Sequence, residues 1–179
     1  MTSLIAVCLA ISSLTGQESA GIEDGVLKVK AMEMAGFVLA HAAWKCDGEA
    51  GNVLVPFSMF ETKKSRITSV YALPRLEDGV KAGRAAMEKK RPLALSTALA
   101  YAGIERPSGA DIIVVEVWYK AGTFEITQKY KLPTKSHPFS LVGDPQITVG
   151  HKPTSDKNLT AALFAGINQH EPARHYWRP

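Results

Sequence analysis

Residues 112–119 read Ile-Ile-Val-Val-Glu-Val-Trp-Tyr, so β-branched and aromatic side chains occupy almost every position, odd and even alike. Residues of these types favour extended backbone. A strand that is apolar on both faces has to be covered on both sides, because either face would otherwise meet water. The segment therefore predicts a strand over residues 111–120 in the middle of a sheet.

A long apolar segment at residues 25–45 is the predicted cover for this strand. It contains no proline and follows the acidic pair Glu23 and Asp24, which suits the start of a helix. Its apolar residues recur at helical spacing at Leu27, Ala31, Met34, Val38 and Ala42. Between Ala35 and Trp44 the segment is apolar nearly all the way round, which predicts a helix buried against the sheet.

Two β-rich segments, 53–61 and 66–73, flank the polar tip 62–65 and predict a hairpin. Because Pro56 has no backbone N–H, we expect the first strand to have an unpaired edge or a bulge at that point. A second helix is expected over residues 76–90. Acidic residues fall in its first turn and basic residues in its last turn, where each charge complements the helix dipole.

The remaining chain predicts two more long strands, a surface excursion with one short strand, and a last helix. Residues 93–102 form an apolar run, and residues 123–131 alternate in the way typical of a strand with one face in water. Residues 132–155 hold four prolines and predict a long surface excursion with one short strand at 146–149. The last helix is expected over residues 156–169, capped by Ser155.

Taken in order, these elements predict an α+β fold with the sequence α-β-β-α-β-β-β and an optional terminal helix. We expect one domain over residues 21–179, with a mainly antiparallel sheet of about five or six strands covered by two or three helices. The chain has 179 residues, of which 46% are hydrophobic and 21% charged. This composition suits one globular domain and excludes collagen, a coiled coil and a largely disordered chain.

Residues 1–20 allow three interpretations. Residues 4–14 form an uncharged apolar run about as long as the hydrophobic region of a secretory signal and too short to span a bilayer. A signal peptide would favour a secreted or periplasmic location over a cytoplasmic one. The absence of any basic residue before Lys28 counts against a signal peptide, because such a peptide begins with a positively charged region. The alternatives are an N-terminal extension that docks on the core as a strand or helix, and a start codon set too early.

The histidines give no metal-binding pattern, because no pair has the spacing of a helical metal site or a zinc finger. His41 falls in the middle of the first predicted helix and is expected to be a satisfied core residue. His137, Asp144 and His151 share the proline-rich excursion and could converge on a metal, but loops collect residues of these types by chance. We predict no catalytic, cofactor-binding or metal-ligating residue from the sequence.

Two other residues stand out chemically. Glu116 interrupts the predicted central strand, where an unpaired carboxylate would be costly to bury. It is expected to point to solvent or to pair with a Lys or Arg, and the alternative is a functional acid with a raised pKa. Cys46 follows the first helix, whose C-terminal dipole disfavours a thiolate, so we expect an inert thiol. Cys8 is the only other cysteine of the chain, so a framework of several disulfides is excluded.

Basic residues form three groups on an otherwise modestly charged chain, whose formal net charge is +4. The groups are Lys63, Lys64 and Arg66; Lys89, Lys90 and Arg91; and Lys129, Lys131 and Lys135. They could contact phosphates only if the fold brought them together. Solvated turns explain them more simply, so nucleic acid is the least favoured partner.

These observations favour a non-enzymatic binding or protein-interaction domain, with another protein or a second copy of the chain as partner. Sheet edges, such as the strand that holds Pro56, would offer the docking place. The first alternative is a small enzyme or small-molecule binder with a pocket near Glu116. The second alternative is nucleic-acid binding through the basic turns.

Overall fold

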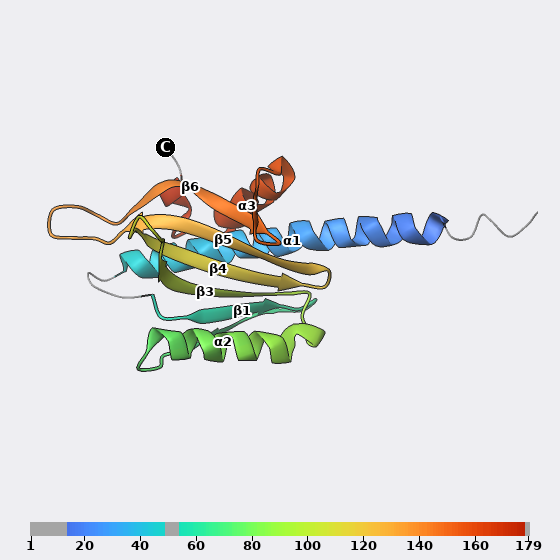
Figure 1. Cartoon of the computed structure of the whole chain (residues 1–179), viewed down its shortest axis with the longest axis horizontal. Coiled ribbons are helices and arrows are strands. Elements are labelled where there is room, and N and C mark those ends of the chain that lie inside the picture. The colour runs from blue at the N-terminus through green and yellow to red at the C-terminus, as the bar shows by residue number, and fades with distance from the viewer. Residues whose placement is uncertain (1–13, 49–53, 178–179) are drawn as a thin grey trace, which may run out of the picture.

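The computed structural model describes residues 14–48 and 54–177, and of residues 14–23 it describes the backbone alone. Seven antiparallel strands form one sheet in the order β2-β1-β3-β4-β5-β6-β7 (Figure 1). The strands are β1 Phe57–Glu61, β2 Arg66–Val70, β3 Ser96–Ile104, β4 Asp111–Tyr119, β5 Gly122–Lys131, β6 Ser140–Val149 and β7 Lys152–Thr154. The α+β class and the antiparallel sheet are confirmed, with seven strands in place of the expected five or six.

β4 lies in the middle of the sheet, paired with β3 along one edge and with β5 along the other. Ile113, Val115 and Val117 are fully buried on one face, and Val114 is 6% exposed on the other. The prediction of a central strand is therefore confirmed, and β4 is covered on both faces at these positions.

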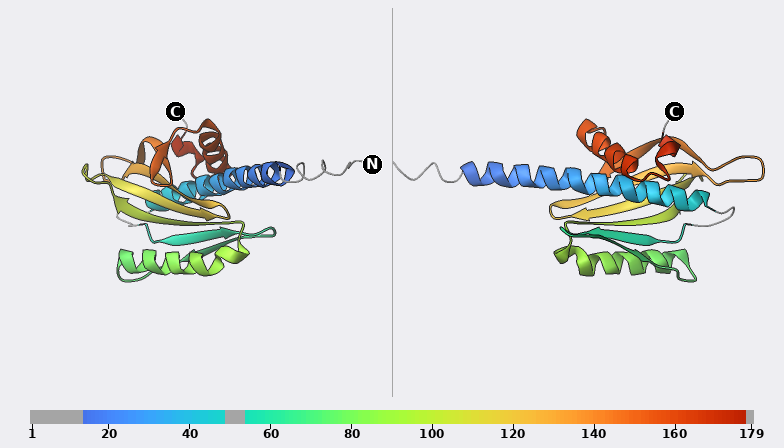
Figure 2. Two further views of the ribbon diagram at one scale, coloured as in Figure 1. Left: turned by 45° about the vertical axis from the view of Figure 1, so that its right-hand side comes forward. Right: turned by 180° about the vertical axis from the view of Figure 1, so that it is seen from behind.

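Three helices cover the sheet, two on one face and one on the other (Figure 2). α1 Leu14–Asp47 and α3 Lys157–Gln169 pack together on the face that carries Ala98 and Ala100 of β3. α2 Leu76–Lys90 covers the opposite face, where Leu99 contacts Val80 and Met87 of the helix. A short 3-10 helix, η1 Arg91–Leu93, follows α2, and a second one, η2 Arg174–Trp177, follows α3.

α1 begins well before the expected start at residue 25, and its first turns extend beyond the sheet (Figure 1). Residues 14–24 contain no proline, so nothing stops the helix there, and Glu23 and Asp24 fall inside it. Of the expected core positions, Ala31, Met34, Val38 and Ala42 are fully buried and Leu27 is half-buried. The other questions about residues 1–13, the signal peptide among them, lie outside the described residues.

The hairpin of β1 and β2 is confirmed, but the edge strand is not the one expected. β1 pairs with both β2 and β3, so the strand that follows Pro56 is internal. Pro56 precedes the ladder and contributes only its carbonyl oxygen, which accepts a 2.8 Å hydrogen bond from the N–H of Tyr71. Its missing N–H therefore costs the sheet nothing, and β2 forms the edge.

The expected surface excursion over residues 132–155 is the main error of the sequence-based prediction. Most of it forms β6 and β7, and only residues 132–139 and two short turns remain outside strands. β6 tolerates Pro145 because it lies near the edge of the sheet, where few ladder bonds are lost. Opposite, the register shifts between Thr127 and Lys129, and the buried amide of Gln128 donates to the carbonyl oxygens of Val142 and Gly143. Those bonds satisfy backbone groups that the bulge leaves open.

The two shorter helices form where they were expected. α2 spans residues 76–90 as predicted. α3 is capped by Asp156 and not by Ser155: the Asp156 carboxylate accepts hydrogen bonds from the N–H groups of Asn158 at 2.9 Å and Leu159 at 3.4 Å. Within the part of the chain that is described, none of the helices combines the length and apolar character needed to cross a bilayer.

Candidate functional site

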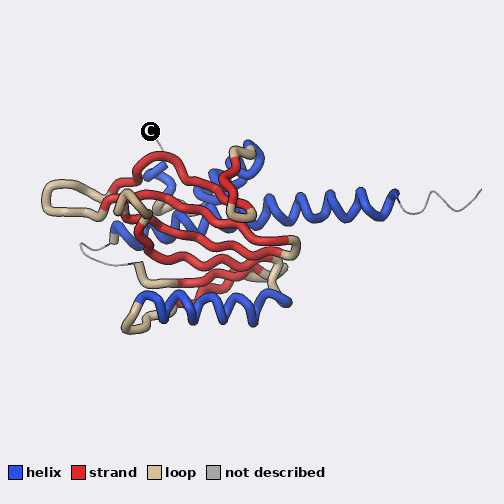
Figure 3. Tube along the Cα trace, in the orientation of Figure 1, coloured by secondary structure: helices blue, strands red, loops and turns tan. Residues whose placement is uncertain are grey.

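The strands form one sheet (Figure 3), and β2 is the strand at one of its edges. Half of the backbone groups of β2 therefore have no strand partner among the described residues. In an antiparallel ladder, alternate residues of an edge strand point their N–H and C=O groups away from the sheet. The N–H of Tyr71 bonds to Pro56 in the inward direction. By alternation, the backbone groups of Arg66, Thr68 and Val70 point outward. An extended chain could therefore pair with β2 along its whole length.

A groove of about 300 Å³ lies beside this edge, between β2 and the C-terminal half of α1. We call it the edge groove. Its lining residues are His41, Lys45, Leu54, Val55, Phe57, Thr68 and Val70. Val70 is 64% exposed and Val55 is 44% exposed, although both are large apolar residues. The groove thus joins open backbone groups to apolar side chains that stay exposed in the described part of the chain.

On the side of the edge groove formed by α1, the lining residue His41 contacts a second histidine, His170. His41 Nδ1 lies 3.1 Å from Nε2 of His170, the C-cap residue of α3, so the two rings share a hydrogen bond. His41 also packs edge-on against Phe57 at 5.2 Å between ring centroids, and its ring lies 5.6 Å from that of Trp44. Such packing holds the groove wall in one arrangement.

Burial keeps both histidines neutral. Desolvation, followed by electrostatic interactions with His170 and Lys45, lowers the pKa of His41 to about 4. Desolvation also lowers the pKa of His170. Nδ1 of His170 is buried without a hydrogen-bond partner among the described residues. We expected His41 to be a core residue whose hydrogen-bonding groups have partners. Its bond to His170 agrees with this expectation, but the residue is only half-buried.

Positive charge surrounds the edge groove. Lys45 lines it, with its ammonium 4.8 Å from the centre of the Trp44 ring, and no carboxylate of the described residues pairs with that ammonium. Arg66 begins β2, lies over the Phe37 ring and pairs with Glu61 at 2.9 Å. The turn that leads into β2 adds the exposed Lys63 and Lys64. An acidic ligand would therefore be favoured over a basic one.

Glu116, the acidic residue that interrupts the apolar central strand, is paired with basic and hydroxyl groups. Its carboxylate accepts hydrogen bonds from Nε of Arg84 on α2, at 3.0 and 3.2 Å, and from the Tyr101 hydroxyl at 2.7 Å. Burial by itself raises the pKa of Glu116, but the bonds from Arg84 and Tyr101 and the Arg84 charge outweigh it, so the pKa lies below the ordinary value. The expected pairing with an arginine is confirmed, and the alternative of a raised pKa is wrong.

A small pocket of about 170 Å³ lies beside Glu116 and is lined by residues of β4, β5, β6 and the β6–β7 turn. Glu125 stands directly opposite Glu116 in the ladder, and both line the pocket together with His151. Burial, followed by the negative charge of Glu116, raises the pKa of Glu125. The pocket therefore holds ionisable groups, as the enzyme alternative requires, but it is smaller than ordinary ligand sites.

The other candidates are not assembled into sites. Cys46 is a buried free thiol, and burial followed by the charge of Asp111 raises its pKa to about 12, which makes it a poor nucleophile. Its partner in any disulfide, Cys8, lies outside the described residues. His137, Asp144 and His151 are not brought together, since the described residues contain no group of three or more metal-binding side chains.

The fold brings two of the three basic groups to one end of the sheet and places the third group near the other end. The N–H of Leu95 bonds to the carbonyl of Glu61, and Ser96 pairs with Tyr119, so the β1–β2 turn, η1 and the β4–β5 turn share one end of the sheet. We call this the basic end; its exposed cations are Lys63, Lys64, Lys89, Arg91 and Lys120. Lys129 pairs with Ile112 near the opposite end, so a single surface made of all three groups does not form.

Comparison of the chain with protein-family models, with curated proteins and with solved structures finds no match. The fold and its surfaces therefore carry the functional argument. Sequence reasoning missed the part played by His170 and the open edge of β2. Neither has a local signal, because His170 meets its partner across 129 residues and the strand order decides which strand is the edge.

Proposed function

We propose that the chain is a binding domain that captures an extended segment of another protein by adding it to the edge of β2. Strand addition of this kind draws affinity from main-chain hydrogen bonds and specificity from pockets that receive alternate side chains. The open backbone groups of Arg66, Thr68 and Val70, next to the edge groove, supply both parts.

Register decides which ligand side chains enter the groove. Residues directly opposite in a ladder share a face of the sheet. Thr68 and Val70 point to the groove, so ligand residues opposite these two positions would enter it, with one residue between them pointing away. The ligand is therefore expected to carry apolar side chains at positions i and i+2, with an acidic residue nearby to meet Lys45.

The other edge of the sheet supports the choice of β2. β7 has three residues and contains Pro153, and Pro145 interrupts β6 beside it. Short edge strands and prolines are the usual protection against pairing with another chain. β2 has five residues, no proline and an exposed Ile67 and Val70, so it lacks that protection. The open edge of β2 is the single observation on which the proposal rests.

The test uses a displayed library of random dodecapeptides selected on the folded chain, followed by binding measurements on the enriched peptides. We expect peptides with apolar residues at i and i+2 and a nearby Asp or Glu. Thr68→Pro removes an outward N–H that the ladder with β1 does not use, and Val70→Asp places a charge in the groove. Each should weaken binding about tenfold or more.

Val142→Asp is the matched control, because Val142 is 39% exposed but lies in β6, away from the edge groove. Failure to enrich any peptide, or equal binding by the Val70→Asp and Val142→Asp variants, would overturn the proposal. A dimer in sedimentation analysis that Thr68→Pro dissociates would replace the peptide with a second copy as the occupant, and would likewise overturn it.

A second candidate function, a small-molecule site beside Glu116, is favoured by one observation. Glu125 has no salt-bridge partner among the described residues and lies with Trp118 and His151 around one pocket. Binding of fragment-sized amines and polyols can be screened by NMR on the chain and on its Glu125→Gln variant. Ligands that bind the parent chain and not the variant would support this candidate. A screen without such ligands would exclude it.

A further inference from the structure

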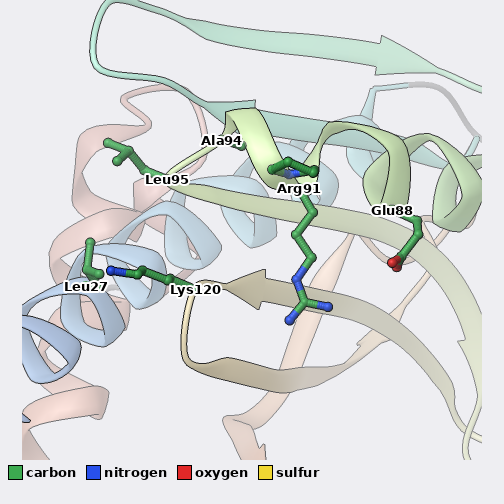
Figure 4. A pocket seen from close by; sticks show the side chains of 7 residues that line it. Leu27, Glu88, Arg91, Ala94, Leu95 and Lys120 are labelled. Carbon is green, nitrogen blue, oxygen red and sulfur yellow. The ribbon is translucent and has the colours of Figure 1, made fainter.

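Two cavities of the described residues differ in the charges that line them. A cavity of about 680 Å³ at the basic end is lined by Glu88 from the last turn of α2 and by Arg91 from η1 (Figure 4). Charges of both signs face this cavity, so it does not select an ion. The pocket of about 170 Å³ beside Glu116 is different, because two glutamates line it and none of its described lining residues is a lysine or an arginine.

Three neighbouring strands build the smaller pocket, which we call the Glu125 pocket. Glu116 of β4 pairs with Glu125 of β5, and Glu125 pairs with Thr148 of β6. Residues directly opposite in a ladder share one face of the sheet, so these three side chains stand in a row across it. Trp118 and Thr123 form the next row toward the β4–β5 turn. The pocket therefore has a floor of paired strands, which hold its side chains in fixed positions.

Only one of the two carboxylates in this row has a partner. Glu116 accepts hydrogen bonds from Arg84 and Tyr101. Glu125 is half-buried and has neither a hydrogen bond nor an ion pair with a described residue. Burial, followed by the charge of Glu116, raises its pKa, as expected for a carboxylate that no bound cation stabilises. Because Arg84 offsets the charge of Glu116, the charge of Glu125 is left without a counterpart.

The turn between β6 and β7 forms another side of the Glu125 pocket. Val149 pairs with Lys152, so Gly150 and His151 form a two-residue turn, and both have positive φ, 56° and 64°. Turns of this kind favour glycine or asparagine, because larger side chains strain the left-handed backbone. His151 nevertheless occupies the second position and lines the pocket. A neutral imidazole there has a nitrogen that accepts a hydrogen bond.

We propose that the Glu125 pocket binds the ammonium group of a small organic amine. The inference rests on the second candidate function and names its ligand class. An ammonium group has three N–H donors. Glu125 accepts a charge-assisted hydrogen bond from one of them, and Thr148 and His151 offer acceptors around the same pocket. The small volume suits a short alkyl chain. The same group ends a lysine side chain, so its source is a free amine or a lysine of another protein.

A chemical-shift titration with butylammonium tests the proposal, because NMR detects ligands of this size, whose Kd is on the order of 1 mM. We expect saturable shifts of the Glu125 and Thr148 amide signals. Glu125→Gln should weaken binding about tenfold or more, since a charge-assisted hydrogen bond is lost. His151→Gly should weaken it less and keep the fold, because glycine suits the turn. Glu88→Gln is the matched control, since it removes the same charge from α2, outside this pocket.

The pKa of Glu125 is a second readout, followed through the carbon-13 signal of its carboxyl group. Bound butylammonium should lower this pKa, because a nearby positive charge stabilises the carboxylate. Butanol and butyrate carry the same chain without the positive charge, and both are expected not to bind. Equal binding of butanol, equal loss in Glu125→Gln and Glu88→Gln, or an unchanged pKa of Glu125 at saturation would overturn the proposal.

Failure of this inference is distinguishable from failure of the second candidate function. If polyols bind the parent and not Glu125→Gln, while butylammonium does not bind, the small-molecule site stands and the amine is wrong. If neither class binds, both are wrong. Nα-acetyl-lysine methylamide separates the two sources: tighter binding than that of butylammonium indicates a lysine side chain, and equal or weaker binding indicates a free amine. Thr68→Pro should bind butylammonium as the parent does, because the edge groove and the Glu125 pocket share no residue.

Discussion

Gly36 of α1 and Gly166 of α3 lie against each other's helix at the place where the two helices cross. A methyl group on Gly36 would overlap the carbonyl oxygen of Leu163, and one on Gly166 would overlap the carbonyl oxygen of Glu33. The two backbones therefore touch without intervening side chains. This close approach brings the C-terminus of α3 beside α1, where His170 meets His41.

Gly36→Ala should destabilise the protein by about 1–3 kcal/mol, because the helices must separate to admit the methyl group. Denaturant unfolding followed by circular dichroism measures this free energy. Gly25→Ala is the control on the same helix, since nothing lies within 4 Å of a Cβ there. Alanine favours helix over glycine, so that variant should be neutral or more stable. Equal effects at both positions would show that the helices do not cross as described.

Neutral His41 and His170 should make folding sensitive to pH between about 4 and 6.5. The pKa of His41 is lowered to about 4 in the folded chain from 6.5 in the unfolded one. The unfolded chain therefore binds more protons in this window, and stability falls as the pH drops from 6.5 toward 4. Because His41 is partly exposed, solvent screening limits the loss to about 1–2 kcal/mol.

The measurement is the free energy of unfolding at several pH values for the parent and for His41→Gln, which should lose much of the slope in that window. His175→Gln, at an exposed position, serves as the control and should keep the slope. A parent chain whose stability is flat from pH 6.5 to 4.5 would contradict buried neutral histidines.

The Glu116 carboxylate should contribute to stability at a lower pH. Its pKa lies below the ordinary 4.5 when the chain is folded, so its contribution is present above pH 4.5 and is lost as the pH falls through the folded-state value. Glu116→Gln should destabilise the protein at pH 7 by about 1–3 kcal/mol, because Arg84 loses a charge-assisted bond. Its unfolding free energy should also change less below pH 4.5. Glu88→Gln, an exposed acid on α2, should show neither effect.

Cys46 should react slowly with thiol reagents in the folded protein. Burial raises its pKa to about 12, so almost none of it is thiolate at pH 8, and access is blocked as well. In a Cys8→Ser background, colour development with Ellman's reagent should be slow in buffer and rapid in guanidinium chloride. Rapid reaction of the folded chain would mean that the C-terminal end of α1 is not buried.

Elements with strong local signals could be predicted from the sequence. β4 follows from its β-branched residues, and α2 follows from charges that match its dipole at both ends. Of β6, only residues 146–149 could be predicted as a strand, because Gly143 and Pro145 are local signals for a turn. The amide of Gln128, fourteen and more residues away, satisfies the backbone there. Such compensation is visible only after the strands are paired.

The candidate site was less predictable than the fold for the same reason. The sequence shows that Glu116 is an acidic residue in an otherwise apolar strand, and a basic partner was expected for it. The sequence does not show that this partner is Arg84. The edge groove depends on the position of β2 at the end of the sheet and on a histidine pair that joins α1 to α3. Both properties arise from tertiary arrangement and leave no periodic pattern in the sequence.

α1 precedes in the sequence the strands on which it packs, and this order has a consequence for synthesis. Its apolar second half leaves the ribosome before β3 and β4, the strands that cover it in the native fold, have been made. Until those strands emerge, the helix exposes an apolar surface on which nascent chains commonly aggregate. Shielding of this helix until β3 and β4 have been made is therefore expected to raise the yield of folded protein in cells.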